Sequence, residues 1–368
     1  MNIGILVPTI TVGGAEKIAI ETASGLKNED DNVVLFVLNK KNNATTLTVK
    51  DGISLVYISS KIKFFELARK FKEFNIDKCL CYLERANFLG LWACLLAGVD
   101  YCASVHTAPR AAFSKRPIIN RFFIKLTYKI IAILDLKVIC VSSGIEDELR
   151  ADYGIKKIKT IPNFIDCDVI NEKSKINSYN NNDEIDFIFV GRIETVKGCD
   201  VFIDSLIYIS DWILDNKIRV AIIGDGTMKG MLEEKINRSS IVANVIFLGE
   251  LDNPYGAMAK SKNIVVPSYA EGFGLVILEA LALNLRVIYS KCDFGPKEII
   301  NKYFPEYEYL GFFNPSENRG LAIEDLSNKI KMAYDRKADD IDWNDKIERV
   351  KHSFSREEVC CQIKEFLV

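Results

Sequence analysis

Two glutamates stand eight positions apart in the segment AEGFGLVILEA (270–280), at Glu271 and Glu279. The segment follows a predicted strand and opens a predicted helix, and Gly272 and Gly274 let its backbone approach a ligand closely. The first N–H groups of the helix favour an anion. If all intervening residues are helical, the glutamates lie roughly 12 Å apart along the axis. Carboxylates at that separation could accept hydrogen bonds from hydroxyls at opposite ends of one polyol.

A structural role for both glutamates is the alternative, with Glu271 complementing the helix dipole and Glu279 solvated on the helix surface. The helix around Glu279 is almost wholly apolar, however (VILEAL, 276–281). A carboxylate in such surroundings needs a partner, which favours a functional role for Glu279.

Cationic side chains occur in a second strand-to-helix loop, GRIETVKG (191–198). Arg192 offers a guanidinium fork and Lys197 a point charge, and Gly191 and Gly198 flank the loop. Such a pair suits a diphosphate. Taken alone, two solvated surface cations are the simpler interpretation.

A third glycine turn holds Gly224 and Gly226 in the order G-x-G-x-x-x-G (224–230), which departs from the G-x-G-x-x-G pattern of dinucleotide sites. Lining a nucleotide site and simply turning the chain both remain open for it.

The first half of the chain offers a glycine pair and a histidine. Gly13 and Gly14 follow the first predicted strand and expose backbone N–H groups at a helix N-terminus, although a tight turn with Glu16 against the helix dipole would use the same residues. His106 directly follows the predicted strand Tyr101–Val105. Doubly wound domains bind ligands at such strand ends, while a purely structural histidine is the alternative.

The elements that must position these residues alternate between strand and helix, which predicts parallel sheets covered on both faces. The predicted strands are Ile3–Val7, Val33–Leu38, Leu55–Ile58, Cys79–Tyr82, Tyr101–Val105, Val138–Val141, Ile158–Ile161, Ile185–Val190, Arg219–Ile223, Val245–Leu248, Ile264–Val266 and Arg286–Tyr289. The predicted helices are Ala15–Leu26, Ala86–Ala97, Ser143–Tyr153, Asp200–Ile209, Met228–Ile236, Leu275–Leu283 and Arg356–Leu367.

The alternation lapses between about residues 164 and 183, a polar and finally Asn-rich stretch typical of an interdomain linker and loop. A chain of 368 residues also exceeds what one core usually supports. We therefore predict two α/β domains, 1–164 and 165–354, with a charged connector before the last helix.

Composition limits the partners and the compartment. The first 165 residues carry a net charge of +7 and the remainder −9, so the first half is expected to face something anionic. Ten cysteines lie mostly in apolar patterns without a CxxC pair, and there are two histidines, so no metal site is predicted. The N-terminus lacks signal-peptide features, and the apolar run Phe88–Val99 is too short to cross a bilayer. We expect a cytoplasmic protein without a nucleic-acid partner.

Taken together, the order of these motifs resembles glycosyltransferase family 4, of the GT-B fold, over nearly the whole chain; the E-x7-E segment is the most specific element. The resemblance implies two Rossmann-like parallel-sheet domains facing a central cleft, with the last helix (about 355–368) packing back on the first domain. One departure is Phe164, where the family's linker usually has glycine after Ile-Pro-Asn.

The resemblance also implies roles for individual positions. Arg192 and Lys197 would bind the donor diphosphate, Glu271 the transferred sugar, and Glu279 the ribose; His106 would contact the sugar from the first domain. The implied catalytic positions are His106, Arg192, Lys197 and Glu271. The implied donor-binding positions are Gly14, Gly191, Gly226, Leu251, Gly272, Phe273, Gly274, Leu275 and Glu279.

As a family member, the chain would transfer the sugar with retention of its anomeric configuration and would need neither a metal nor a cofactor. Its donor would be a nucleotide diphosphate sugar, and UDP is the expected nucleotide because it is the most frequent one in the family. The segments 61–72 and 117–134 are basic and amphipathic, which suggests docking on the inner, anionic membrane surface beside a lipid-linked saccharide acceptor in O-antigen, capsule or lipopolysaccharide assembly. Ordinary domain helices with solvated basic faces are the alternative.

Two other functions remain: a sugar-nucleotide epimerase of the same fold and a non-catalytic nucleotide- or NAD-binding module.

Overall fold

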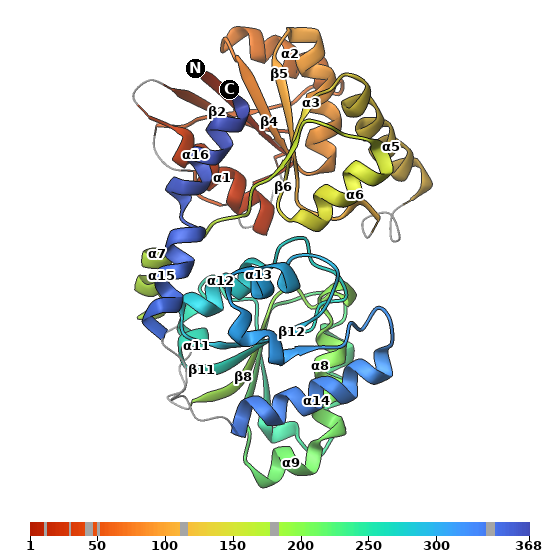
Figure 1. Cartoon of the computed structure of the whole chain (residues 1–368), viewed down its shortest axis with the longest axis vertical. Helices are drawn as coiled ribbons and strands as arrows, with labels where there is room; N and C mark the ends of the chain where they lie inside the picture. Colours follow the sequence, from red (N-terminus) through yellow and green to blue (C-terminus); the bar gives the residue numbers. More distant parts are fainter. Residues whose placement is uncertain are drawn as a thin grey trace. The chain divides into compact units, whose positions relative to one another are not determined.

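The computed structural model describes residues 1–10, 13–28, 31–40, 47–49, 52–110, 117–176, 184–335 and 343–368. The chain divides into two compact units, each built around its own sheet (Figure 1). Unit 1 contains Met1–Phe164 and Phe354–Val368, and unit 2 contains Ile165–Ser353.

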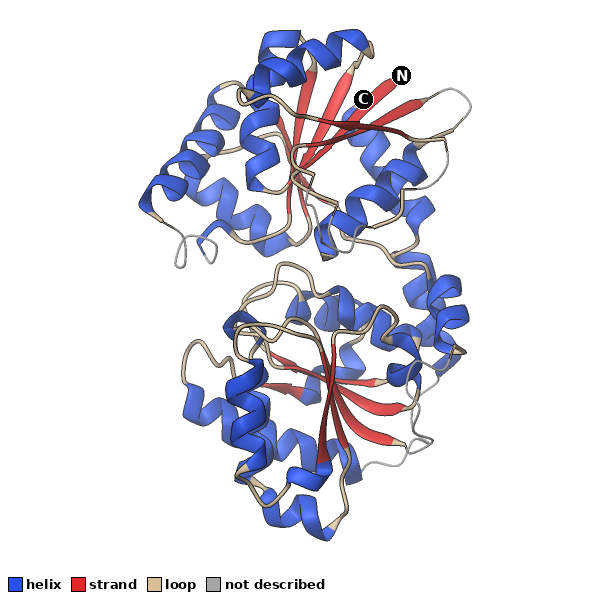
Figure 2. Cartoon of the chain, turned by 180° about the vertical axis from the view of Figure 1, so that it is seen from behind, coloured by secondary structure: helices blue, strands red, loops and turns tan. Residues whose placement is uncertain are grey.

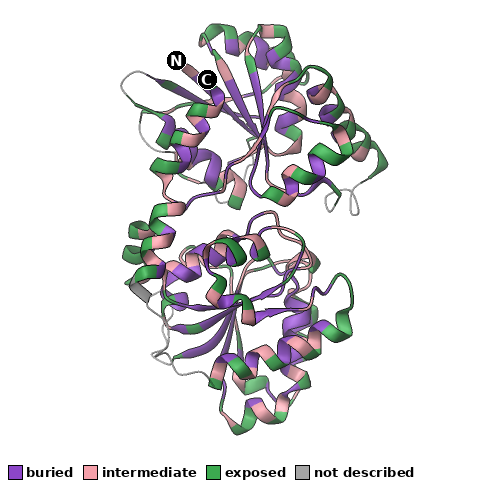
Figure 3. Ribbon diagram, in the orientation of Figure 1, coloured by how far each residue is buried: buried purple, intermediate pink, exposed green. Residues whose placement is uncertain are grey.

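Unit 1 holds a seven-stranded sheet in the order β3-β2-β1-β4-β5-β6-β7, and all of its pairings are parallel. Helices cover both faces of the sheet (Figure 2), and the strands β1, β2, β4, β5 and β6 are almost wholly buried (Figure 3), whereas the edge strand β3 is partly exposed. The strands are β1 Asn2–Val7, β2 Asn32–Val37, β3 Ser54–Tyr57, β4 Lys78–Tyr82, β5 Asp100–Val105, β6 Lys137–Cys140 and β7 Ile158–Thr160. The helices are α1 Gly14–Leu26, α2 Lys63–Glu73, α3 Glu84–Ala97, α5 Ile118–Ile133, α6 Ser143–Tyr153 and α16 Arg356–Leu367.

The C-terminal helix α16 packs against α1 and so completes unit 1, as predicted. Its approach is close: a Cβ at Gly25 of α1 would lie 2.5 Å from the Cys360 sulfur. Lys137 at the start of β6 donates a hydrogen bond of 2.9 Å to the carbonyl of Leu367. The chain therefore returns to its first unit after building the second.

Unit 2 holds a six-stranded parallel sheet in the order β10-β9-β8-β11-β12-β13. Its strands are β8 Ile185–Val190, β9 Val220–Ile223, β10 Val245–Gly249, β11 Ser261–Val266, β12 Arg286–Ser290 and β13 Gly311–Phe312. Its α-helices are α7 Cys167–Ser174, α8 Cys199–Tyr208, α9 Ser210–Asp215, α10 Lys229–Asn237, α11 Tyr255–Ala259, α12 Leu275–Ala282, α13 Pro296–Tyr303, α14 Arg319–Asp335 and α15 Trp343–Ser353. Short 3-10 turns cover Thr195–Lys197, Val242–Asn244 and Pro305–Leu310.

Two segments differ from their prediction. The stretch 164–183, predicted as linker and loop, contains helix α7; its Asn-rich end at 177–183 lies outside the described residues. The carboxylate of Asp166 caps α7 by accepting a hydrogen bond of 3.0 Å from the Val169 amide. Only Ile170 of this helix is buried, so the sequence carries too little apolar periodicity to reveal it. The predicted connector after β12 likewise holds α13, α14 and α15.

In each sheet the strand order reverses direction once, between β1 and β4 in unit 1 and between β8 and β11 in unit 2. At such a switch point the two following loops run to opposite faces of the sheet and leave room beyond the carboxyl edge, where ligands of doubly wound folds bind. The loops 191–198 and 267–274 follow β8 and β11. The two motifs that contain Lys197 and Glu271 therefore lie at the switch point of unit 2.

Candidate active site at the switch point of unit 2

Three loops at the carboxyl edge of unit 2 are held together by backbone hydrogen bonds. The amide of Tyr269, after β11, donates to the carbonyl of Val196, after β8, over 2.9 Å. The amide of Ile193 donates to the carbonyl of Asp225, after β9, over 2.8 Å. These bonds satisfy loop backbone groups and fix the relative positions of the residues that the loops carry.

Glycine is required where these loops touch. Gly198 has a φ of +70°, and a Cβ there would lie 1.8 Å from the carbonyl oxygen of Pro267. Gly224 has a φ of +137°, and its Cβ would lie 1.9 Å from the carbonyl oxygen of Gly191. The glycines of the two motifs thus allow neighbouring loops to pack backbone against backbone.

Lys197 and Glu271 meet across the switch point. The Lys197 Nζ lies 2.6 Å from Oε1 and 2.7 Å from Oε2 of Glu271, so the ammonium engages both carboxylate oxygens. The Lys197 side chain is 25% exposed and that of Glu271 10%, so the pair is largely shielded from water. Glu271 therefore forms an ion pair with one specific cation. This direct contact replaces the interaction with the helix dipole that was the structural alternative for Glu271.

Arg192 sits differently from Lys197. Its side chain is exposed and has no hydrogen-bond or ion-pair partner among the residues that the structure describes. The loop around it is nevertheless joined to the loop after β9, because the Glu194 carboxylate accepts hydrogen bonds from the amide (3.0 Å) and the hydroxyl (2.7 Å) of Thr227. Arg192 thus presents its guanidinium to solvent from a loop that is hydrogen-bonded to its neighbour.

Glu279 has the partner that its apolar helix required. The hydroxyl of Tyr255, at the start of α11, donates a hydrogen bond of 2.8 Å to Glu279 Oε1. Helix α12 begins only at Leu275, with Gly274 at φ +96° as its N-cap, so the residues after Glu271 are not helical. The 12 Å separation expected for a continuous helix therefore does not apply. Sequence reasoning missed Tyr255, since nothing in a spacing of 24 residues connects it to Glu279.

Most of the remaining predicted donor positions lie in loops of the same unit. Gly272 is half-buried and Phe273 buried in the loop before α12, and Leu275 opens that helix. Gly226 is half-buried, and a Cβ there would lie 2.5 Å from the carbonyl oxygen of Ile193. Leu251 is half-buried in the loop after β10.

The two predicted positions of unit 1 lie beyond strand ends as expected. Gly14 is exposed and opens α1, while Thr11 and Val12 before it lie outside the described residues. His106 follows β5, and its Nε2 lies 2.9 Å from the hydroxyl of Ser104. Its ring stacks on Tyr82 at 5.2 Å between centroids. Ser104 and Tyr82 were not singled out in the sequence, because they lie within predicted strands and no local pattern connects them to His106.

Burial lowers the pKa of His106 to about 4, below its ordinary 6.5. We expect His106 to stay neutral at pH 7, and the stability that comes from its neutral form to be lost as pH falls from about 6.5 towards 4. An NMR titration checks this, with His352→Gln assigning the two imidazole signals. A His106 signal that titrates near pH 6.5 would contradict the expectation.

The described residues contain neither a cluster of metal ligands nor a helix that could span a membrane. No group of three or more His, Cys, Asp or Glu side chains is arranged there to hold a metal ion. No helix of the described residues is both long and apolar enough to cross a bilayer. Most cysteines, including Cys79, Cys81, Cys94, Cys102 and Cys140, are buried thiols, as expected from their apolar surroundings.

Two family models match the chain. Residues 12–169 fit the model of "Glycosyltransferase Family 4", and residues 171–339 fit that of "Glycosyl transferases group 1". The chain belongs to glycosyltransferase family 4. The two models meet within helix α7, next to the division between the units, so each describes one of them.

Two curated relatives of this family 4 glycosyltransferase are named for transfer to lipid-linked saccharides. One is the Campylobacter jejuni GalNAc-α-(1→4)-GalNAc-α-(1→3)-diNAcBac-PP-undecaprenol α-1,4-N-acetyl-D-galactosaminyltransferase, 25% identical over 82% of this chain and 82% of the relative. Another is the Escherichia coli UDP-Gal:α-D-GlcNAc-diphosphoundecaprenol α-1,3-galactosyltransferase, 26% identical over 77% of each chain.

Solved structures share the fold. The Anabaena protein HepE in complex with UDP and glucose has a TM-score of 0.73 and 18% identity, covering 99% of this chain and 98% of its own. Sucrose-phosphate synthase from Thermosynechococcus elongatus has a TM-score of 0.76 and 17% identity, covering 99% and 97%. The expected GT-B architecture, with two parallel-sheet Rossmann-like units, is confirmed.

Proposed function

We propose that this glycosyltransferase moves a hexose or N-acetylhexosamine from a UDP-sugar to a lipid-linked saccharide with retention of anomeric configuration. The observation that carries the donor part is the Lys197–Glu271 pair at the switch point of unit 2, beside the exposed Arg192. A cation and a polar acceptor placed together there suit the diphosphate and the sugar of one donor.

The chemistry proposed for these residues is electrostatic. Departure of the nucleoside diphosphate leaves negative charge on the β-phosphate, and Arg192 and Lys197 stabilise it together with the N–H groups at the start of α12. In this scheme the residues do the work of a divalent metal, and no cofactor takes part. His106 remains neutral and contacts the sugar as a hydrogen-bonding group, held by Ser104.

Glu271 is proposed to position the sugar rather than attack it. Both of its carboxylate oxygens are engaged by Lys197, which supports a positioning role over a nucleophilic one. The acceptor hydroxyl then attacks on the face from which the diphosphate departs, and the leaving phosphate takes its proton. Mass spectrometry of the enzyme incubated with donor alone tests this, because a glycosyl ester on Glu271 would overturn it.

The acceptor proposal rests on the relatives, whose names specify undecaprenyl-diphosphate-linked saccharides. A saccharide of this class would place the reaction in O-antigen, capsule or lipopolysaccharide assembly. The function is tested by thermal-shift measurements with nucleotide diphosphates and their sugars, followed by transfer to a lipid-linked acceptor. Stabilisation by NAD and not by UDP would favour a dinucleotide-binding module. A change of donor stereochemistry without acceptor would favour an epimerase.

Tyr255→Phe is expected to weaken binding of UDP about 10-fold, because the hydrogen bond that orients the Glu279 carboxylate is lost. If Glu279 binds the ribose, the loss should be much smaller for 2′-deoxy-UDP, whose missing hydroxyl no longer reports on the carboxylate. Calorimetric titration of both nucleotides measures the difference. Tyr208→Phe, on an exposed tyrosine of α8, is the matched control. Equal losses for both nucleotides would mean that Tyr255 acts only on folding.

A further inference from the structure

Helix α5 turns an apolar face away from its own unit. Its inward residues are Ile124, Thr127, Tyr128 and Ile131. On the opposite side, Ile118, Ile119, Phe122 and Ile133 each expose between 61% and 80% of their surface. Four large apolar residues at that exposure on one helix face are unusual for a surface in contact only with water.

The apolar surface continues onto helix α3. The two helices are in contact, and the ring of Phe88 on α3 lies 5.2 Å from that of Phe123 on α5. Successive turns of α3 beyond Phe88 then expose Trp92, Leu95 and Leu96. We call the combined surface of these exposed residues of α3 and α5 the α3–α5 face.

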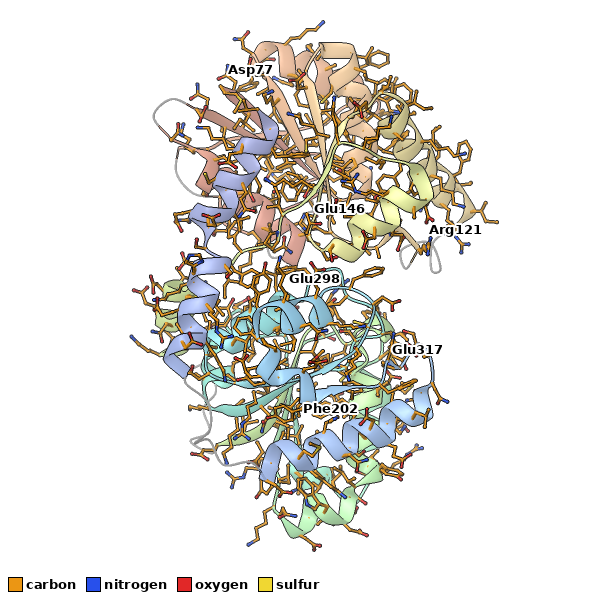
Figure 4. All side chains as sticks on the ribbon, viewed as in Figure 1. Asp77, Arg121, Glu146, Phe202, Glu298 and Glu317 are labelled. Atoms are coloured by element: carbon orange, nitrogen blue, oxygen red, sulfur yellow. The ribbon has the colours of Figure 1, made fainter. Side chains whose placement is uncertain are left out.

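Cations are interleaved with the apolar residues of this face. Lys125 and Lys129 are exposed, and helical geometry places them on the same side of α5 as Phe122. Arg121 lies at the outer edge of unit 1 (Figure 4). The segment 118–134 contains no aspartate or glutamate. Helix α5 thus combines exposed apolar side chains with cations and carries no acid of its own.

We propose that the α3–α5 face docks on an anionic lipid bilayer, with α5 lying in the headgroup region. A bilayer surface offers acyl chains to the apolar side chains and negative headgroups to the lysines, and Trp92 suits the boundary between them. A second copy of the chain fits less well, because a self-complementary contact would set the same cations against each other. The inference rests on the proposed function only in that a lipid-linked acceptor lies at such a surface.

Co-sedimentation of the full chain with sucrose-loaded vesicles tests the proposal. The protein is expected to bind vesicles containing about one-third phosphatidylglycerol at least 10-fold more tightly than phosphatidylcholine alone, and to dissociate as salt is raised. Ile119→Ser with Phe122→Ser should abolish binding, and Lys125→Gln with Lys129→Gln should remove its dependence on salt. All four side chains are exposed, so the melting temperature should not change.

Matched controls lie in unit 2. Leu321→Ser with Met332→Ser changes exposed apolar residues of α14, and Lys217→Gln with Lys302→Gln removes exposed cations, so both should leave vesicle binding intact. Equal binding to both vesicle types, no binding at low salt, or a dimer that the Ile119→Ser, Phe122→Ser variant dissociates would overturn the proposal. UDP binding is measured in parallel, so that failure of the membrane proposal can be told apart from failure of the proposed donor function. A chain that does not bind UDP could still bind vesicles, and a chain that does not bind vesicles could still bind UDP.

Discussion

Lys197→Ala is expected to lower kcat by roughly 10³-fold, the scale on which one preorganised group that stabilises transition-state charge contributes. The substitution removes a cation proposed to face the leaving diphosphate, and it also leaves the shielded carboxylate of Glu271 without its 2.6 Å partner. Glu279→Ala is the comparison, since its proposed contact with the ribose is already made in the ground state. That variant should raise KM with little change in kcat, and equal losses of kcat would undermine the assigned roles.

A double variant separates catalysis from folding at the same pair. Lys197→Met alone strands a carboxylate, while Lys197→Met with Glu271→Gln removes both charges and keeps the shapes. We expect the double variant to recover the melting temperature but not the transfer rate. If activity returned together with stability, the pair would be only structural, and the donor phosphate would have to be held elsewhere.

Gly198→Ala is expected to destabilise unit 2 by about 3 kcal/mol or more and to abolish most transfer activity. Two costs combine there: a positive φ, and a Cβ that would lie 1.8 Å from the Pro267 carbonyl oxygen. Relief of that overlap must move the loop carrying Lys197 away from the loop carrying Glu271. Thermal unfolding and UDP binding measure the two effects.

Gly154→Ala is the matched control for this substitution. Gly154 also has a φ of +70°, but a Cβ there meets nothing within 4 Å. It should therefore lose only the backbone term of about 1 kcal/mol. If the two alanine variants melted at the same temperature, backbone strain alone would account for both, and the close packing of the loops would carry no energetic weight.

Local pattern predicted most of the architecture, because a buried parallel strand and an amphipathic helix each leave a short-range signature. The strand Ile185–Val190 and the helices Ser143–Tyr153 and Arg356–Leu367 have the predicted bounds. Pattern failed where few side chains are buried. Helix α7 was hidden because only Ile170 faces the core, and its start depends on a cap at Asp166.

For the site, residue type and loop position indicated candidate side chains but not which of them meet. Arg192 and Lys197 were expected to act as a cationic pair, yet the structure places Lys197 on Glu271 and leaves Arg192 at the surface. The reason is the sheet order, which sets the loops after β8 and β11 side by side although 74 residues separate Lys197 and Glu271.

The sequence by itself determined most of the elements, the glycine loops and the identity of the charged groups, because strand and helix periodicity and the freedom of glycine are local properties. Only the tertiary structure decided the partners. The apolar helix around Glu279 indicated that its carboxylate needs a donor, but the choice of Tyr255 depends on where α11 packs. Similarly, the segment 117–134 read as basic and amphipathic, and its packing showed which side faces the core and how α3 extends the exposed one.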